Sequence, residues 1–129
     1  MSIVENKAII RLIYEEALNK GNLAIVDEVF ASQFVDHSTP EQVPGTGGVK
    51  DYFAQVRRGF PDIRVTIDDL IAAEDKVVVR TIWRGTHQGF YEGTEPTSRQ
   101  VKRTMIQIFR ISDGKIQEEW NEGAGLLVE

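Results

Sequence analysis

The chain has no cysteine among its 129 residues. This absence excludes disulfides, thiolate metal ligands and cysteine nucleophiles. Histidine is also scarce: His37 and His87 are the only two, and neither the HxH nor the HxxxH spacing of metal sites occurs. The glycines of "GTGG" (residues 45–48) lack the Lys-Ser/Thr pair of a phosphate-binding loop. We therefore expect no metal and no cofactor.

A basic surface and a long apolar run are missing as well. The net charge is −5, and Lys and Arg do not gather in a stripe, so nucleic acid and anionic membranes are poor partners. No apolar run is long enough to span a bilayer, and charges interrupt the first ten residues, unlike the apolar core of a signal peptide. These features predict a cytoplasmic protein.

What the sequence does contain is typical of a globular fold. Apolar residues make up 41% of the chain and charged residues 27%. A length of 129 residues is usual for one domain and allows a sizeable core to be buried. We therefore interpret residues 1–129 as a single domain.

Helical periodicity dominates the first half of the chain. Ser2 and Glu5 have the spacing of a capping box, and Pro61 stops the last helical pattern. Residues 31–48 begin with a short extended segment and then have the composition of a loop. We predict three helices, over residues 2–20, 22–30 and 49–60.

Strand patterns follow in the second half, rich in Val, Ile, Thr and aromatic residues. They cover residues 63–73, 76–88, 99–112 and 115–122. Helices first and an antiparallel meander afterwards are typical of an α+β fold.

The register of the last hairpin decides which side chains share a face. With residues 112–114 as a three-residue loop, polar and apolar residues separate cleanly. One face is then apolar: Ile106, Ile108, Ile116 and Trp120. The other face is mixed: Met105, Gln107, Phe109, Gln117, Glu119 and Asn121.

The composition of each face of this hairpin suggests what the face contacts. The mixed face is either one wall of a small-molecule pocket or an exposed face with two scattered apolar residues. If the helices cover the mixed face, the apolar face needs another cover. We therefore expect a homodimer through this side of the sheet.

Four stretches of the sequence carry a resemblance to a known family. They are "FVDH" (34–37), "FPD" (60–62), "RGTHQG" (84–89) and "DGKIQEEW" (113–120). Together with the segments around them, they make the chain resemble the SnoaL-like polyketide cyclases, also called SnoaL-like ester cyclases, over nearly its whole length. The resemblance implies a cone-shaped α+β roll, in which three N-terminal helices pack on a curved antiparallel sheet and enclose a pocket.

The resemblance also implies an activity. Cyclases of this family close a polyketide ring by intramolecular aldol condensation, without metal or cofactor. They use an Asp directly after the Trp of the last strand and a His on the strand before it. At these positions the chain has Asn121 and Gln107. Both are amides that only donate and accept hydrogen bonds, so the cyclase mechanism does not transfer intact.

Four titratable residues are candidates for the missing proton carrier: Glu119, Asp36, His37 and His87. Glu119 shares the parity of Asn121, and a carboxyl group in a partly apolar pocket has a raised pKa. The alternative for Glu119 is an exposed glutamate. Asp36 and His37 end a short extended segment, and because neighbours on a strand point to opposite faces, only one of them enters a pocket easily. The alternative for this pair is a turn before Pro40.

Aromatic residues and the second histidine complete the candidate site. We interpret Met105, Phe109, Trp83, His87 and Tyr91 as candidates to bind the ligand. The alternative for His87 is a structural histidine whose hydrogen bonds are satisfied. The alternative for Trp83 and Tyr91 is a place in the core.

The sequence thus predicts cofactor-independent acid/base chemistry, of isomerase, lyase or cyclase type, on a small and largely apolar carbonyl compound. The candidate catalytic residues are Glu119, Asn121, Gln107, Asp36 and His37. The alternative is a non-catalytic protein on the same fold, which binds a small molecule or serves as a dimerisation module.

Overall fold

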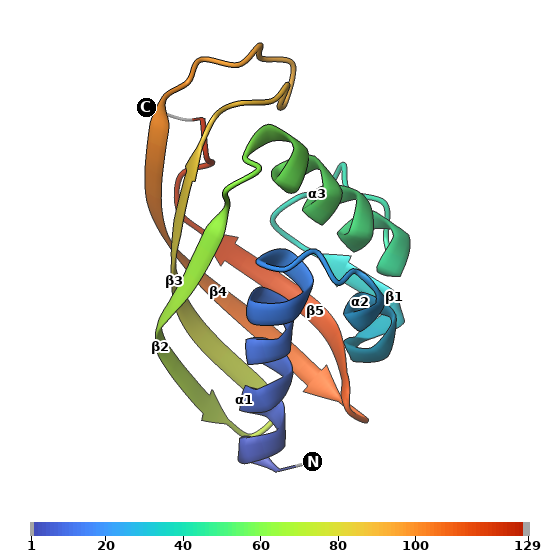
Figure 1. Cartoon of the computed structure of the whole chain (residues 1–129). Helices are drawn as coiled ribbons and strands as arrows, with labels where there is room; N and C mark the ends of the chain where they lie inside the picture. Colours follow the sequence, from blue (N-terminus) through green and yellow to red (C-terminus); the bar gives the residue numbers. More distant parts are fainter. Residues whose placement is uncertain (1, 128–129) are drawn as a thin grey trace.

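A computed structural model describes residues 2–127 of the chain. Helices occupy most of the first half and strands the second half, which confirms the predicted α+β class. In Figure 1 the helices lie together on one face of a curved sheet. Within residues 2–127, no helix is long and apolar enough to cross a membrane.

The first helix begins where the capping box predicts. The hydroxyl of Ser2 accepts a hydrogen bond from the N–H of Glu5 at 3.0 Å, and the Glu5 carboxylate accepts one from the N–H of Ser2 at 3.2 Å. Helix α1 spans Ile3–Leu12 and continues as a π-helical segment, η1, over Ile13–Leu18. Segments of π-helix are rare and often lie at functional sites. In η1, four side chains are buried: Ile13, Tyr14, Ala17 and Leu18.

Two further helices follow, α2 over Ala24–Val29 and α3 over Thr46–Gly59. Helix α3 starts three residues earlier than predicted, because the glycines that resemble a loop belong to its first turn. A Cβ at Gly48 would lie 1.8 Å from the backbone oxygen of Val43, so this turn requires glycine.

The strands form one mixed sheet in the order β1-β5-β4-β3-β2. Their bounds are Phe30–Asp36, Arg64–Ala73, Lys76–Thr86, Gln100–Ser112 and Lys115–Glu122, for β1 to β5. Strands β2 to β5 form the predicted antiparallel meander. The prediction of a fully antiparallel sheet was wrong, because β1 joins the edge parallel to β5. Only the start of β1 looked extended in the sequence, since its register shifts and its side chains do not alternate in burial.

The last hairpin differs from the predicted one. Asp113 and Gly114 form a two-residue turn, with the positive φ values of 53° and 72° that a type I′ turn requires. Ser112 therefore pairs with Lys115. The register then shifts between Arg110 and Ile111, which leaves Gln117 as the extra residue of a β-bulge in β5.

The bulge has the same effect on parity as the longer loop that we predicted. Gln107 pairs with Asn121 and Phe109 with Glu119, so these four side chains share one face. Only the residues next to the turn, Ile116 and Gln117, lie on the faces opposite to those that we predicted. Ile116 is buried in the core, whereas Gln117 hydrogen-bonds to Gln33 at the edge. A parity count cannot distinguish a three-residue loop from a two-residue turn with a bulge.

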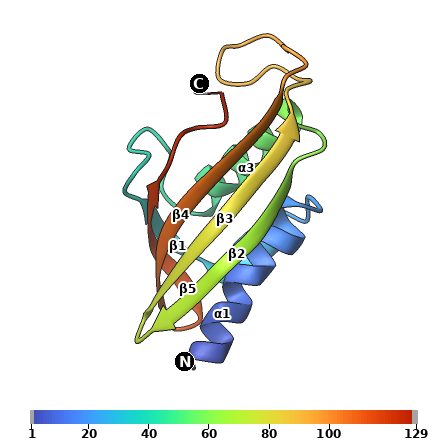
Figure 2. The same ribbon diagram turned by 90° about the vertical axis from the view of Figure 1, so that its left-hand side faces the viewer.

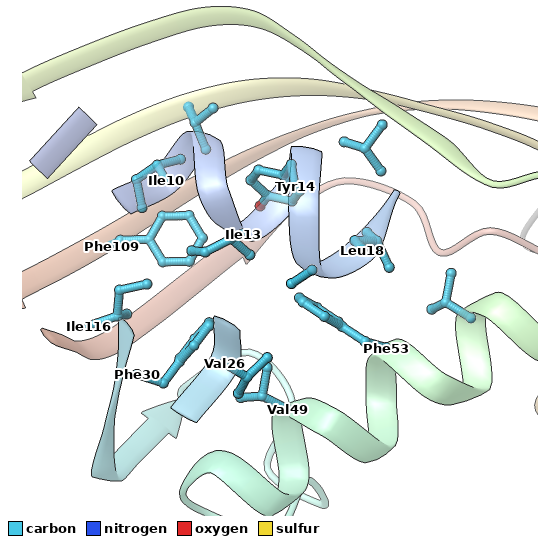
Figure 3. Packing of buried hydrophobic residues seen from close by; sticks show 14 of the residues in the cluster. Ile10, Ile13, Tyr14, Leu18, Val26, Phe30, Val49, Phe53, Phe109 and Ile116 are labelled. Carbon is cyan, nitrogen blue, oxygen red and sulfur yellow. The ribbon is translucent and has the colours of Figure 1, made fainter. Parts of the chain in front are cut away.

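The core lies between the helices and the inner face of the sheet. Figure 3 shows Phe109 and Ile116 of the sheet close to Ile10 and Ile13 of the first helix. Phe53 of α3 packs from the other side. Burying one such side chain contributes about 1.5–3 kcal/mol to the stability of the fold. The packing of these side chains therefore holds the helices against the sheet.

The type I′ turn can be tested through Gly114. A residue with a Cβ is strained at its φ of 72°, and asparagine is strained less than alanine. We expect Gly114→Ala to lower the free energy of unfolding by about 1 kcal/mol and Gly114→Asn by less. Urea unfolding measures both variants. Equal stability of Gly114→Ala and the parent chain would contradict the turn.

Candidate active site

A cavity of about 300 Å³ lies between the first helix, α3 and the inner face of the sheet. This volume is at the small end of the range for ligand pockets. One part of its wall is apolar: Ile13, Phe30, Val49, Phe53, Trp83, Met105 and Phe109. Polar side chains converge on the same space: Tyr14, Asp36, Tyr52, Gln107, Glu119 and Asn121. Seven of the ten residues predicted from the sequence therefore line one cavity.

The parallel pairing of β1 with β5 brings two carboxyl groups together. Asp36 is the Cα partner of Glu119, and the N–H of His37 donates to the backbone oxygen of Glu119 at 2.9 Å. Both carboxyl side chains line the cavity. Asp36 thus reaches the site from the first strand, whereas Gln107 and Asn121 lie on the last two.

Asn121 holds the Asp36 carboxylate in place. Its Nδ2 donates to both carboxylate oxygens, at 3.2 and 3.1 Å. The backbone N–H of Ser38 donates to one of the same oxygens at 2.9 Å. A carboxylate only accepts hydrogen bonds, so it requires a donor opposite it. An ionised aspartate at position 121 has no donor to offer, whereas asparagine has.

The two carboxyl groups differ in their electrostatics. Burial raises the pKa of Glu119 well above its ordinary value, and the negative charge of Asp36 raises it further, while a hydrogen bond from Asn121 lowers it in part. Burial also raises the pKa of Asp36, but hydrogen bonds oppose this shift. Two close carboxyl groups ionise together only at a high cost. When the pair holds a single proton, that proton is therefore on Glu119 and Asp36 is ionised.

Gln107 presents its amide nitrogen to the cavity. The side chain is only 1% exposed. The indole N–H of Trp83 donates to the hydroxyl of Thr81 at 2.9 Å, and that hydroxyl donates to Oε1 of Gln107 at 2.9 Å. The oxygen of the amide is thus occupied. Within residues 2–127 its NH₂ group has no hydrogen-bond acceptor, so it is free to bind a ligand oxygen.

Two tyrosines of the cavity were missed in the sequence. Burial raises the pKa of Tyr14 well above its ordinary value, and the charge of Glu119 adds to the shift. Burial also raises the pKa of Tyr52, and the charge of Glu119 is the second cause. Both phenols therefore stay protonated and are neutral donors. No sequence signal separates them from core residues, since each has an ordinary apolar position in its helix.

His37 lies on the opposite face of the sheet from Asp36. Its ring stacks on Trp120, with 5.0 Å between centroids and 16° between planes. Its Nε2 lies 2.9 Å from Oε1 of Glu118, and Arg110 donates to the second oxygen of Glu118. Neighbours on a strand point to opposite faces, and here it is the aspartate that faces inward.

His87 and Tyr91 also lie outside the cavity lining. Strand β3 ends at Thr86, so the strand parity no longer applies to His87. The imidazole is fully buried, stacks on Phe60 and contacts the Thr97 hydroxyl through Nδ1 at 3.0 Å. Tyr91 packs edge-on against the same Phe60 ring. Both residues anchor the segment between β3 and β4 rather than contact the cavity.

Comparison with known proteins identifies the family of the chain. The family model described as SnoaL-like polyketide cyclase matches residues 8–123. The chain belongs to the SnoaL-like polyketide cyclase family. No curated protein matches the chain.

Solved structures of similar proteins support the family and the fold. IdmH from Streptomyces antibioticus, to which a polyketide cyclase activity is ascribed, is 31% identical, with a TM-score of 0.75 over 90% of this chain and 89% of its own. AclR from Streptomyces galilaeus, to which a hydroxylase activity is ascribed, is 27% identical. Its TM-score is 0.82, over 95% of this chain and 77% of its own. TsrD from Streptomyces laurentii shares the fold at 23% identity, with a TM-score of 0.88 over 95% and 90%.

The raised pKa of Glu119 makes the stability of the fold depend on pH. The folded chain holds this proton more tightly than the unfolded chain, so the free energy of unfolding falls as the pH rises from 4.5, the ordinary value, toward the folded value. Glu119→Gln removes this group. We expect the variant to gain up to about 1.4 kcal/mol over the parent per pH unit in that window. Urea unfolding between pH 4 and pH 8 measures the difference.

Glu118→Gln is the matched control for this experiment. The neighbouring carboxyl faces the other side of the sheet, where hydrogen bonds from Arg110 and His37 lower its pKa. Its contribution to stability is therefore present above the ordinary value and lost as the pH falls, so the control should lose stability relative to the parent at neutral pH. A constant difference between Glu119→Gln and the parent at every pH would contradict the proposed protonation of Glu119.

Proposed function

We propose that the protein catalyses cofactor-independent proton transfer on a small, largely apolar carbonyl compound, as an isomerase, lyase or cyclase. The observation that carries the proposal is the cluster of Asp36, Asn121 and Glu119 beside the NH₂ group of Gln107 in one cavity. Such a cluster combines a base, an acid and a neutral donor without a metal. Membership in the SnoaL-like family supports the same class of reaction.

In this proposal Asp36 is the general base. Its carboxylate removes a proton from the carbon next to the carbonyl group, and the electrons of that C–H bond form an enolate with its charge on oxygen. The NH₂ group of Gln107 and the protonated carboxyl of Glu119 donate hydrogen bonds to this oxygen. Asp36 then returns the proton to another carbon, or the enolate carbon attacks a second carbonyl group and the alkoxide that forms takes the proton from Asp36.

The exchange of Asp for Asn at position 121 relocates the base rather than removing it. An aspartate at this position would put a third carboxyl group beside Asp36 and Glu119, and three negative charges in one partly buried site are unfavourable. With asparagine, the ionised group is on β1 and the amide orients it through two hydrogen bonds. Asn121 is therefore a positioning residue.

Proton exchange at carbon provides the test. The protein is incubated in D₂O with 1-indanone or 1-tetralone, two flat apolar ketones, and deuterium uptake next to the carbonyl is followed by NMR. We expect catalysed uptake, with Asp36→Asn slower by about 10²–10⁴-fold and Glu119→Leu, which removes the donor, slower by about 10²–10³-fold. Asp51→Asn is the control, because Asp51 is an exposed carboxylate of α3 outside the cavity lining.

Two outcomes would count against the proposal. If Asp36→Asn exchanges as fast as the parent, Asp36 is not the base. If the ketones bind in the cavity but none of the proteins accelerates exchange, the non-catalytic alternative replaces the enzyme, namely a small-molecule-binding protein on the same fold.

We also propose that the protein forms a homodimer through the outer face of the sheet. Figure 2 shows β2, β3 and β4 in front, with the helices behind them. The pairing of the strands places four apolar side chains in one row across this face: Ile71, Val78, Ile108 and Trp120. Ile71 is 58% exposed and Ile106, in the next row, is 45% exposed. A second copy would bury both isolated apolar groups.

The dimer is tested with a charge on this face. We expect the parent chain to sediment as a dimer at micromolar concentration and Ile106→Asp to sediment as a monomer, because a buried unpaired carboxylate costs several kcal/mol. Val4→Asp is the control, since Val4 is exposed on α1, away from the sheet. A parent chain that sediments as a monomer, or an Ile106→Asp variant that stays dimeric, would contradict the interface.

A further inference from the structure

The charge of the cavity lining is of one sign. Four acidic residues line it: Asp36, Glu41, Glu92 and Glu119. Among the residues that the structure describes, no Lys, Arg or His lines the same space. A lining of this kind repels anions, and no basic side chain among the described lining residues balances Asp36, Glu41 and Glu92, so a cationic ligand would be stabilised there.

The acidic groups are not spread evenly over the cavity. Glu41 and Glu92 are exposed residues of the two segments that follow β1 and β3, so they belong to its solvent-open side. Asp36 and Glu119 lie deeper, beside the apolar wall. The cavity is therefore apolar at one end and negatively charged toward solvent.

The buried amide of Gln107 independently indicates a ligand. Its side chain is 1% exposed, its oxygen is bound to Thr81, and its NH₂ group has no acceptor within residues 2–127. A donor that lines a cavity without a protein acceptor can bind a ligand there, so a ligand oxygen is a natural partner. The basic side chain farther along this strand, Arg103, does not line the cavity and donates to the backbone oxygen of Gly125 at 3.2 Å.

We infer that the substrate carries a cationic nitrogen on an apolar, carbonyl-containing body. The carbonyl oxygen would accept from Gln107 at the apolar end, and the cation would face Glu41 and Glu92 toward solvent. Aromatic side chains of the wall, Tyr52 and Trp83 among them, also attract cations. The inference excludes carboxylates, phosphates and coenzyme A esters as substrates. It rests on the proposed function, because it takes this cavity as the substrate site.

Three matched ketones test the charge. They are 4-acetyl-N,N,N-trimethylanilinium, its neutral isostere 4-tert-butylacetophenone, and the anion 4-acetylbenzoate. We expect calorimetric titration at low ionic strength to give a Kd for the cation about tenfold below that of the neutral isostere, and the weakest binding for the anion. Added salt should reduce the preference, since the charges toward solvent are screened.

Variants of Glu41 and Glu92 test whether these two carboxylates cause the preference for the cation. Glu41→Gln and Glu92→Gln should each reduce the ratio of the two Kd values about threefold, without changing the affinity for the neutral ketone. Glu95→Gln is the control, because Glu95 lies on the same segment as Glu92 but does not line the cavity. Both tested residues are exposed, so the variants should unfold in urea as the parent does.

The outcomes separate this inference from the proposed function. Equal affinity for the cation and its isostere, tighter binding of the anion, or no binding of any of the three would overturn the inference. A cation preference that depends on Glu41 and Glu92, together with no deuterium exchange in any ketone, would leave the inference standing and refute the proposed catalysis. Deuterium exchange of neutral ketones without a preference for the cation would support the proposed catalysis and refute the cationic substrate.

Discussion

The site depends on the parallel pairing of β1 with β5. This pairing makes Asp36 the partner of Glu119, and it brings Asp36 within hydrogen-bond distance of Asn121, a residue 85 positions later in the chain. Backbone hydrogen bonds of the pair fix the relative position of the strands far more firmly than side-chain contacts across a cavity could. Without β1 at the edge, the inner face of β5 would carry a glutamate and an amide with no ionised partner.

The bulge at Gln117 is the second constraint, because it decides which glutamate enters the cavity. Glu118 and Glu119 are adjacent glutamates, yet their environments shift their pKa values in opposite directions. Arg110 and His37 lower the pKa of Glu118 on the outer face, and burial raises the pKa of Glu119 on the inner face. A shift of one residue in β5 would exchange these two roles.

The neutral residues of the site work through fixed orientation. Asn121 points its nitrogen at Asp36, and the chain from Trp83 through Thr81 to Gln107 turns the Gln107 nitrogen toward the cavity. An amide rotates easily in water, but in a buried network each hydrogen bond determines the next. The hydrogen bonds of the two amides thus fix the directions in which Asn121 and Gln107 donate.

The sequence by itself determined most of the elements and seven of the residues that line the cavity. Capping signals, turn residues and the change from helical to strand periodicity are local, and they place the three helices and the last four strands within a few residues of their observed bounds. Parity along β4 and β5 also groups Gln107, Phe109, Glu119 and Asn121, since a side-chain period of two is a local property. The family resemblance in short motifs drew attention to Asp36.

Only the tertiary structure decided how these groups act together. Whether Asp36 or His37 faces inward depends on the strand that β1 joins, and that choice is a long-range contact without a local signal. Tyr14 and Tyr52 resemble core residues until the cavity beside them is known. His87 has the parity of a site residue, but β3 ends one residue before it. Pairing partners and cavities arise from contacts between distant segments, which no local period encodes.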